Sequence, residues 1–119
     1  MIKGLGSIRL EVSDLGRSLA FYVEGLRFDL IAPPDGVPRR AELRAGSLRL
    51  TLAEAPRAGG GRRLAGVSFR VHVFALEAYR SAVVARGVET GAPVSEHGVR
   101  QFAVRDPDGY IWLFCESLD

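Results

Sequence analysis

Two kinds of hydrophobic spacing divide the chain into short strands and two helices. Residues 7–12 place Ile8, Leu10 and Val12 at every second position, which predicts a half-buried strand. The same alternation returns at residues 67–71. Each alternating stretch precedes apolar residues at helical spacing, so the chain divides into two similar halves.

The first half continues with a helix and three more strands. Ser13 and Asp14 are candidate N-caps, because their side-chain oxygens can accept hydrogen bonds from the amides of the first turn. Gly25 suits the left-handed position that ends a helix. Strands are expected at residues 28–31, 39–45 and 48–52; the first ends at Pro33-Pro34, and turns follow at Asp35-Gly36 and Gly46.

The second half repeats this plan. A helix is predicted at residues 75–86, with apolar residues along one face and Gly87 at its end. Strands are expected near residues 88–94, 101–105 and 110–116. Residues 106–109, Asp-Pro-Asp-Gly, predict the tight turn before the last strand, because every one of them is a common turn former.

The order of elements is therefore β-α-β-β-β, twice, which predicts an α+β fold rather than an alternating α/β fold. We expect a single domain over residues 1–119. It would have a first module at about 1–54, a glycine-rich linker at 55–63 and a second module at about 64–119. Helices on one face of a curved antiparallel sheet would leave the other face as a concave cup.

The composition is typical of a globular intracellular protein. With 47% hydrophobic and 25% charged residues, a chain of 119 residues can bury a core. Its start lacks a signal-peptide pattern and no apolar run could span a bilayer, so we expect a cytoplasmic location and no membrane partner. Cys115 is the one cysteine, which excludes an intrachain disulfide.

Arginine supplies all but one of the sixteen basic residues, although the formal net charge is only +2. Two explanations stay open: a compositional bias, or a basic pocket for anions. The arginines are spread along the chain without interleaved aromatic residues and without a nucleic-acid-binding motif. We therefore expect no nucleic-acid partner.

Two motifs resemble those of a known family. Residues 12–15, Val-Ser-Asp-Leu, followed by 17–22, Arg-Ser-Leu-Ala-Phe-Tyr, resemble the first-helix signature of the glyoxalase/bleomycin resistance/extradiol dioxygenase superfamily, also called vicinal oxygen chelate proteins. Residues 106–110 resemble its final hairpin, and 85–88 the end of its second helix. The resemblance covers nearly the whole chain and implies two βαβββ modules around a cup. One departure is Arg27, where the family usually has glycine.

Metal-binding members of this family carry His, Glu or Gln ligands at four strand positions. The resemblance maps these positions onto Ser7, Thr51, Gly66 and Leu113. None of these residues offers a strong ligand for a divalent metal, and a catalytic site needs about three such protein ligands. His72, expected just past a strand, and His97, in a turn, are expected to be surface or capping residues. We therefore predict no metal and no cofactor.

Alternation also predicts which side chains face the cup. The candidate ligand-binding residues are Ser7, Arg9, Glu11, Arg49, Thr51, Ser68, Arg70 and Leu113. Glu11 and Arg70 hold equivalent places in the two halves, so they could form an ion pair. The arginines form either a solvated structural network or a site for an anionic small molecule, bound by bidentate contacts.

Catalytic chemistry has little support in the sequence. The catalytic residues are unknown, and Glu11 is the one weak candidate for a general base. Ser7, Ser68 and Cys115 have no histidine placed as a base, which argues against nucleophilic catalysis.

The sequence therefore favours a metal-free protein that binds or sequesters an anionic or polar metabolite or drug, in a cup at or near a homodimer interface. A dimer is expected from the resemblance, and because open sheets leave edges that need covering. The alternatives are a metal-independent lyase or isomerase, a glyoxalase- or dioxygenase-like enzyme of the same superfamily, and a structural or regulatory dimer with a relict cup.

Overall fold

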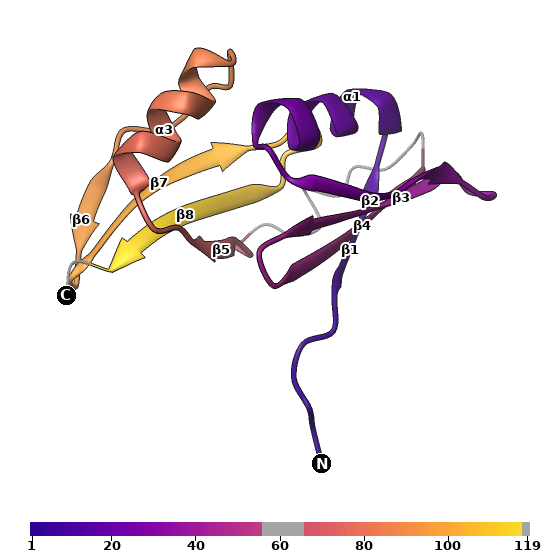
Figure 1. Ribbon diagram of the computed structural model, residues 1–119, viewed down its shortest axis with the longest axis horizontal. Helices are drawn as coiled ribbons and strands as arrows, with labels where there is room; N and C mark the ends of the chain where they lie inside the picture. Colours follow the sequence, from indigo (N-terminus) through magenta and orange to yellow (C-terminus); the bar gives the residue numbers. More distant parts are fainter. Residues whose placement is uncertain (56–65, 118–119) are drawn as a thin grey trace. The chain divides into compact units, whose positions relative to one another are not determined.

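The computed structural model describes residues 1–55 and 66–117, which belong to two compact modules (Figure 1). The first module comprises the described residues up to Ala55, and the second comprises those from Gly66 onward. The expected linker at residues 55–63 lies outside the described residues, except for Ala55.

The first module has one helical segment and a four-stranded sheet. Its elements are β1 (Ile8–Val12), α1 (Leu15–Leu19), the π-helical η1 (Ala20–Gly25), β2 (Asp29–Asp35), β3 (Arg40–Ala45) and β4 (Leu48–Glu54). The strand order is β1-β4-β3-β2. β2, β3 and β4 form an antiparallel meander, whereas β1 pairs with β4 in parallel.

The second module repeats this topology. Its elements are β5 (Phe69–His72), α3 (Leu76–Ala85), β6 (Val94–Glu96), β7 (Val99–Arg105) and β8 (Ile111–Ser117). The strand order is β5-β8-β7-β6, with β5 parallel to β8 and the other pairs antiparallel.

The predicted α+β fold and its β-α-β-β-β repeat are confirmed. Each sheet is mixed, however, and not antiparallel throughout. The reason is the helical connection: a chain that leaves a sheet through a helix returns in the same direction, so the first strand of each module ends up parallel to its last.

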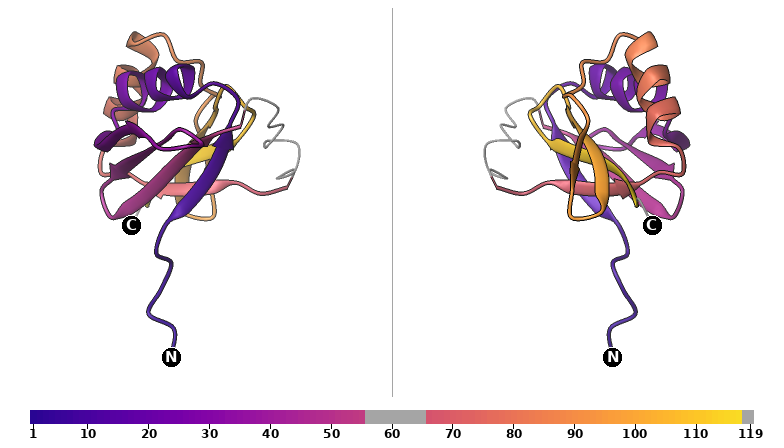
Figure 2. Two further views of the ribbon diagram at one scale, coloured as in Figure 1. Left: turned by 90° about the vertical axis from the view of Figure 1, so that its right-hand side faces the viewer. Right: turned by 90° about the vertical axis from the view of Figure 1, so that its left-hand side faces the viewer.

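The core of the first module lies between its helical segment and one face of its sheet (Figure 2). The alternating residues of β1 and β4 are fully buried there, together with apolar residues of the helical segment. They are Leu10, Val12, Leu50, Leu52, Leu15 and Tyr22. Each such side chain contributes about 1.5–3 kcal/mol when it leaves water. Residues 1–7 extend away from this sheet as an exposed tail (Figure 2).

The core of the second module is aromatic. Trp112 and Phe114 in β8 are fully buried, and Trp112 packs against Phe69 with ring centroids 4.9 Å apart. Phe114 contacts Phe102 of β7 at 5.4 Å and Tyr79 of α3 at 5.0 Å. These ring contacts pack α3 against one face of the sheet, the face on which the sequence alternation predicts the core.

A glutamate from the last strand of each module caps the helix of that module. The Glu54 carboxylate accepts a hydrogen bond of 2.9 Å from the backbone N–H of Leu15, 39 residues earlier. The Glu116 carboxylate accepts one of 3.3 Å from the backbone N–H of Leu76, 40 residues earlier. In both modules an anion therefore meets the partial positive charge of a helix N-terminus.

The end of the first helical segment differs from the prediction. Asp14 is the N-cap, as expected, and accepts from the Arg17 N–H, whereas Ser13 accepts from the Arg17 side chain. Gly25, however, lies inside η1 and is not left-handed. The left-handed residue is Arg27, with φ of 63°, because the π-helical turn carries the segment two residues farther before it reverses.

Two predicted strand limits are also wrong. β2 continues through Pro33 and Pro34, because it is an edge strand with an irregular register and prolines cost no ladder bond there. The strand expected at residues 88–94 begins only at Val94. Before it, Gly91 donates one backbone bond to Ala103, and Pro93 has no N–H to continue the ladder.

The remaining turn predictions are confirmed. Gly36 and Gly46 take positive φ in the two hairpins of the first module, and Gly87 takes φ of 89° after α3. In the turn at residues 106–109, the Asp106 carboxylate accepts from the backbone N–H groups of Asp108 and Tyr110. This side chain therefore replaces backbone partners that the turn leaves unsatisfied.

Candidate functional site

The sheet face opposite the helical segment carries the polar residues of the first module. In the register of this sheet, Arg9 of β1 and Glu42 of β3 both lie beside Thr51 of β4, which puts all three side chains on one face. Two residues earlier in β4, on the same face, Arg49 lies beside Arg44 of β3. The face is thus rich in charge of both signs.

Three of the predicted ligand-binding residues line one pocket of about 220 Å³ on this module. They are Ser7, Arg49 and Thr51; the other lining residues are Gly6, Ile31, Glu42, Leu43 and Leu50. The sequence interpretation missed Glu42. The alternation of β3, with Ala41 and Leu43 buried and Glu42 exposed, is the signal that could have found it.

Arg9 and Glu11, also predicted for the site, are partners within β1. Their side-chain nitrogen and oxygen are 3.9 Å apart, and the side chains are 57% and 44% exposed. An ion pair this open to water contributes about 0–1 kcal/mol. This geometry favours the solvated network for Arg9. The strand registers make Arg70 the equivalent of Arg9, since Arg9 lies beside Thr51 as Arg70 lies beside Leu113. The expected equivalence of Glu11 and Arg70 is therefore wrong. An ion pair between Glu11 and Arg70 would join the two modules and stays a prediction.

The second module places its predicted site residues on the equivalent face. Arg70 of β5 lies beside Leu113 of β8 in the parallel register, and Ala103 of β7 lies on the other side of Leu113. Ser68 is exposed just before β5 begins. This face is therefore less polar at its centre than the face of the first module.

His72 differs most from the sequence interpretation. It is the last residue of β5 and lies beside Cys115 of β8, with 3.5 Å between His72 Nδ1 and Cys115 Sγ. The prediction that Cys115 has no neighbouring histidine is therefore wrong, because the β5–β8 register joins residues 43 positions apart. His72 is nevertheless exposed, as expected, and so is His97, which lies in a turn.

The thiol of this pair is not poised as a nucleophile. Burial raises the pKa of Cys115 above its ordinary value, and the nearby Arg70 guanidinium offsets only part of that effect. The thiol also lies 3.5 Å from the Val71 carbonyl oxygen, to which it can donate its proton. A protonated thiol is a weak nucleophile, so the pair is better suited to packing than to covalent chemistry.

A family model for the glyoxalase/bleomycin resistance protein/dioxygenase superfamily matches residues 4–114. The chain belongs to this superfamily. No curated protein sequence matches the chain closely enough to count as a relative.

Solved structures of superfamily type share the fold. An antibiotic binding protein from a Streptomyces species matches with a TM-score of 0.78 and 22% identity, covering 98% of each chain. A fosfomycin resistance protein from Listeria monocytogenes matches at 0.80 and 19% identity, covering 98% of this chain and 95% of its own. The bleomycin-binding protein of Streptomyces verticillus, solved with copper(II)-bleomycin, matches at 0.72 and 22% identity, covering 96% and 97%. At these identities the likeness shows the fold alone.

The residues at the positions to which the resemblance maps the metal ligands do not fit a divalent metal. Ser7 and Thr51 share the pocket of the first module but offer only hydroxyl groups. Gly66 has no side chain, and Leu113 is apolar. Over residues 1–55 and 66–117, no group of three His, Cys, Asp or Glu side chains is arranged to hold a metal ion.

None of the helices in the described part of the chain is long and apolar enough to cross a membrane.

Proposed function

We propose that this superfamily member binds or sequesters a small anionic or polar molecule without a resident metal ion. The ligand would occupy a cup formed by the sheet faces opposite the helices, at or near the interface of a homodimer. The observation that carries this proposal is the pocket of the first module, in which Arg49, Ser7 and Thr51 come together.

The chemistry of this pocket supports a polar ligand. Arg49 offers a planar fork of N–H donors that matches a carboxylate or phosphate. The Ser7 and Thr51 hydroxyl groups can donate or accept beside it, and the Glu42 carboxylate accepts only. A molecule with an anionic group next to a hydroxyl or amine would satisfy all four side chains.

The metal-free state is supported by the donor set. Ser7, Thr51, Gly66 and Leu113 offer two hydroxyl groups and no strong metal ligand. Catalysis through a cation that polarises the substrate therefore has no support at these positions. A binding role is also that of two of the similar structures, an antibiotic binding protein and a bleomycin-binding protein. A single buried thiol suits a reducing cytoplasm, where we expect the protein to act.

The test is a thermal-shift screen with matched probes, for example benzoate against benzamide, followed by calorimetry on each hit. We expect the anion of each pair to raise the melting temperature more than its neutral partner. Arg49→Ala and Arg70→Ala should weaken the best anion at least about tenfold, the cost of truncating one partner of a desolvated charge pair. Arg17→Ala, on the exposed helix side of the first module, should change affinity less than about twofold.

Neutral or cationic hits that bind as well as anions would contradict the anion preference. Arginine variants that bind like the parent protein would place these arginines in a solvated network. Elemental analysis of the purified protein should find no stoichiometric Zn, Ni, Mn or Fe; one chelatable equivalent would contradict the metal-free state. Light scattering should give the mass of a dimer at micromolar concentration.

A second candidate is a metal-independent enzyme, a lyase, isomerase or glyoxalase- or dioxygenase-like catalyst. It would have to use the contact between His72 and Cys115, although the raised pKa of the thiol works against it, or Glu11 as an acid–base group. Incubation of each binding hit with the protein, followed by mass spectrometry, distinguishes the candidates. Product that accumulates with the parent protein and disappears in Cys115→Ser or Glu11→Gln would establish the enzyme; unchanged ligand supports the binding protein.

A further inference from the structure

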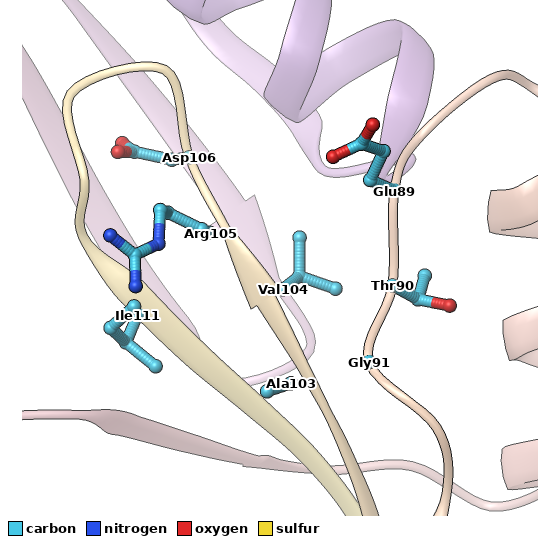
Figure 3. A pocket seen from close by; sticks show the side chains of 8 residues that line it. All are labelled: Glu89, Thr90, Gly91, Ala103, Val104, Arg105, Asp106 and Ile111. Atoms are coloured by element: carbon cyan, nitrogen blue, oxygen red, sulfur yellow. The ribbon is translucent and has the colours of Figure 1, made fainter.

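A second and larger pocket lies in the second module, at the turn between β7 and β8. Its volume is about 540 Å³, within the range of about 300–1,000 Å³ that small-molecule sites occupy. One wall is the segment 89–91 after α3, and the other is formed by the ends of β7 and β8 (Figure 3). It shares Ala103 with the sheet face of the second module described above, but none of the residues that line the pocket of the first module.

Both walls of this pocket are held by hydrogen bonds. The Gly91 N–H donates to the Ala103 carbonyl over 2.9 Å, which ties the segment 89–91 to β7. The Arg80 side chain of α3 donates to the Gly91 carbonyl over 3.4 Å. On the opposite wall, the Asp106 carboxylate accepts two backbone N–H bonds, of 2.9 and 2.8 Å, that hold the turn closed. The pocket is therefore formed before any ligand arrives, which lowers the cost of binding.

Two opposite charges face this pocket without a partner. Figure 3 shows Glu89 and Arg105 on opposite sides of Val104, which lies between them. Within the described part of the chain, neither the Glu89 carboxylate nor the Arg105 guanidinium makes an ion pair or a hydrogen bond. Asp106 is also in the wall, but its carboxylate already accepts backbone bonds.

The surface between these charges is apolar. Val104 is buried, and Ala103 and Ile111 are half-buried beside it. An aliphatic chain lying here would cover the parts of Ala103 and Ile111 that otherwise meet water, at about 25 cal/mol for each Å² covered. A ligand with one charge would leave the opposite wall without a partner.

We propose that this pocket binds a small zwitterion of the α-amino acid class. Its ammonium group would pair with Glu89, its carboxylate with Arg105, and its aliphatic side chain would lie over Ala103 and Ile111. Because both charged residues are exposed, each pair adds little affinity, and the expected dissociation constant is on the order of 1 mM. The proposal does not depend on the cup or on the absence of a metal.

The experiment is an amide NMR titration of the whole chain with three probes of the same branched alkyl group. L-leucine has both charges, 4-methylpentanoate lacks the ammonium group, and 3-methylbutylamine lacks the carboxylate. We expect leucine to shift the amides of Thr90, Gly91 and Arg105, and both analogues to bind about two- to fivefold more weakly. An analogue that binds as tightly as leucine overturns the zwitterion. The absence of shifts at these amides at about 10 mM leucine overturns the site.

Charge-neutral variants provide the second measurement. Glu89→Gln and Arg105→Gln keep the shape of the walls and remove one charge each, so each should weaken leucine about fivefold. Glu96→Gln removes an exposed carboxylate in β6, outside the pocket, and should leave the affinity unchanged. If all three variants bind leucine equally, the two charges do not recognise it and the proposal is wrong. Leucine shifts confined to Ser7 and Thr51 would assign binding to the first module instead.

Discussion

The two modules share one topology but begin their helices differently. In the first, Asp14 caps α1 from within the segment and Glu54 caps it from the last strand. In the second, Ala75 precedes α3 and supplies no side-chain cap, and Glu116 supplies the side-chain hydrogen bond to the first backbone N–H of the helix. The cap from the strand is therefore the feature common to both halves, whereas the cap from the sequence neighbour is an addition in one of them.

The modules also end their helices differently. Gly87 takes φ of 89° after α3, which costs a glycine little. Arg27 takes φ of 63° after η1, a conformation that costs other residues about 1–2 kcal/mol. The first module thus has the better helix start and the more strained helix end. A repeated fold tolerates a local cost in one copy when neighbouring contacts hold the chain in place.

The largest expected effect compares the cores. In the first module, Leu50 of β4 lies beside Ile8, the first residue of β1. In the second, Trp112 of β8 lies beside Phe69, the first residue of β5, so Trp112 and Leu50 are equivalent positions. Both are fully buried. Trp112→Ala should lower the free energy of unfolding by about 3–5 kcal/mol and Leu50→Ala by about 2–5 kcal/mol, measured by circular dichroism in urea.

The shape of these unfolding curves tests the prediction of a single domain. One cooperative transition, shifted by either variant, is expected if the modules unfold together. Two transitions, each moved by only one of the variants, would mean that the modules unfold independently. Fluorescence of Trp112, the chain's single tryptophan, reports the second module in the Leu50→Ala protein.

The next effect compares the strand glutamates. Glu116→Ala should cost about 2 kcal/mol, because α3 loses its side-chain cap and a charged hydrogen bond. Glu54→Ala should cost about 1 kcal/mol, because Asp14 still caps α1. Glutamine at either position keeps the acceptor and should recover at least half of the loss. Equal costs in the two modules would show that Asp14 does not compensate.

A smaller effect compares the helix ends. Gly87→Ala should destabilise the protein by about 1 kcal/mol, since alanine is strained at this φ. Arg27→Gly should stabilise it by about 0.5 kcal/mol, because relief of strain exceeds the extra entropy of the unfolded chain. Thermal unfolding of both variants gives the two signs directly. A loss of stability in Arg27→Gly would mean that the arginine side chain contributes more than its backbone costs.

The smallest effect concerns one hydroxyl group. Ser18, fully buried in α1, has a hydroxyl oxygen with no hydrogen-bond partner among the described residues. Tyr79 holds the corresponding place in α3 and packs its ring against Phe114. Ser18→Ala removes an unsatisfied polar group and adds a better helix former, so it should stabilise the protein by about 0.5 kcal/mol. Destabilisation beyond about 1 kcal/mol would indicate that a water molecule or another group satisfies the hydroxyl.

The fold could be predicted because its signals are local. Alternation gave the faces of β1, β4 and β5, and the turn formers at residues 106–109 gave the last hairpin. The errors arose where the outcome depends on distant partners. Pro33 and Pro34 are tolerated only because β2 lies at an edge, and Arg27 is left-handed only because a π-helical turn precedes it.

The candidate site was predicted less completely for the same reason. Ser7, Arg49 and Thr51 were identified from alternation alone, and they line one pocket. Glu42 was missed because its strand was assigned without a face. The contact of His72 with Cys115 depends on the pairing of β5 with β8, which joins residues 43 apart and leaves no local trace in the sequence.

The strand glutamates have a consequence for how such chains can be rearranged. Each one links the end of a module to the helix start of that same module, so each half is closed upon itself. If two molecules exchanged their chains between residues 55 and 66, each would receive a whole half from the other, and neither glutamate hydrogen bond would be broken. An exchange at a point inside one half, between the helix and the last strand, would put the helix and its capping glutamate on different chains. Recombination, circular permutation and domain swapping should therefore be tolerated best at the junction of the modules.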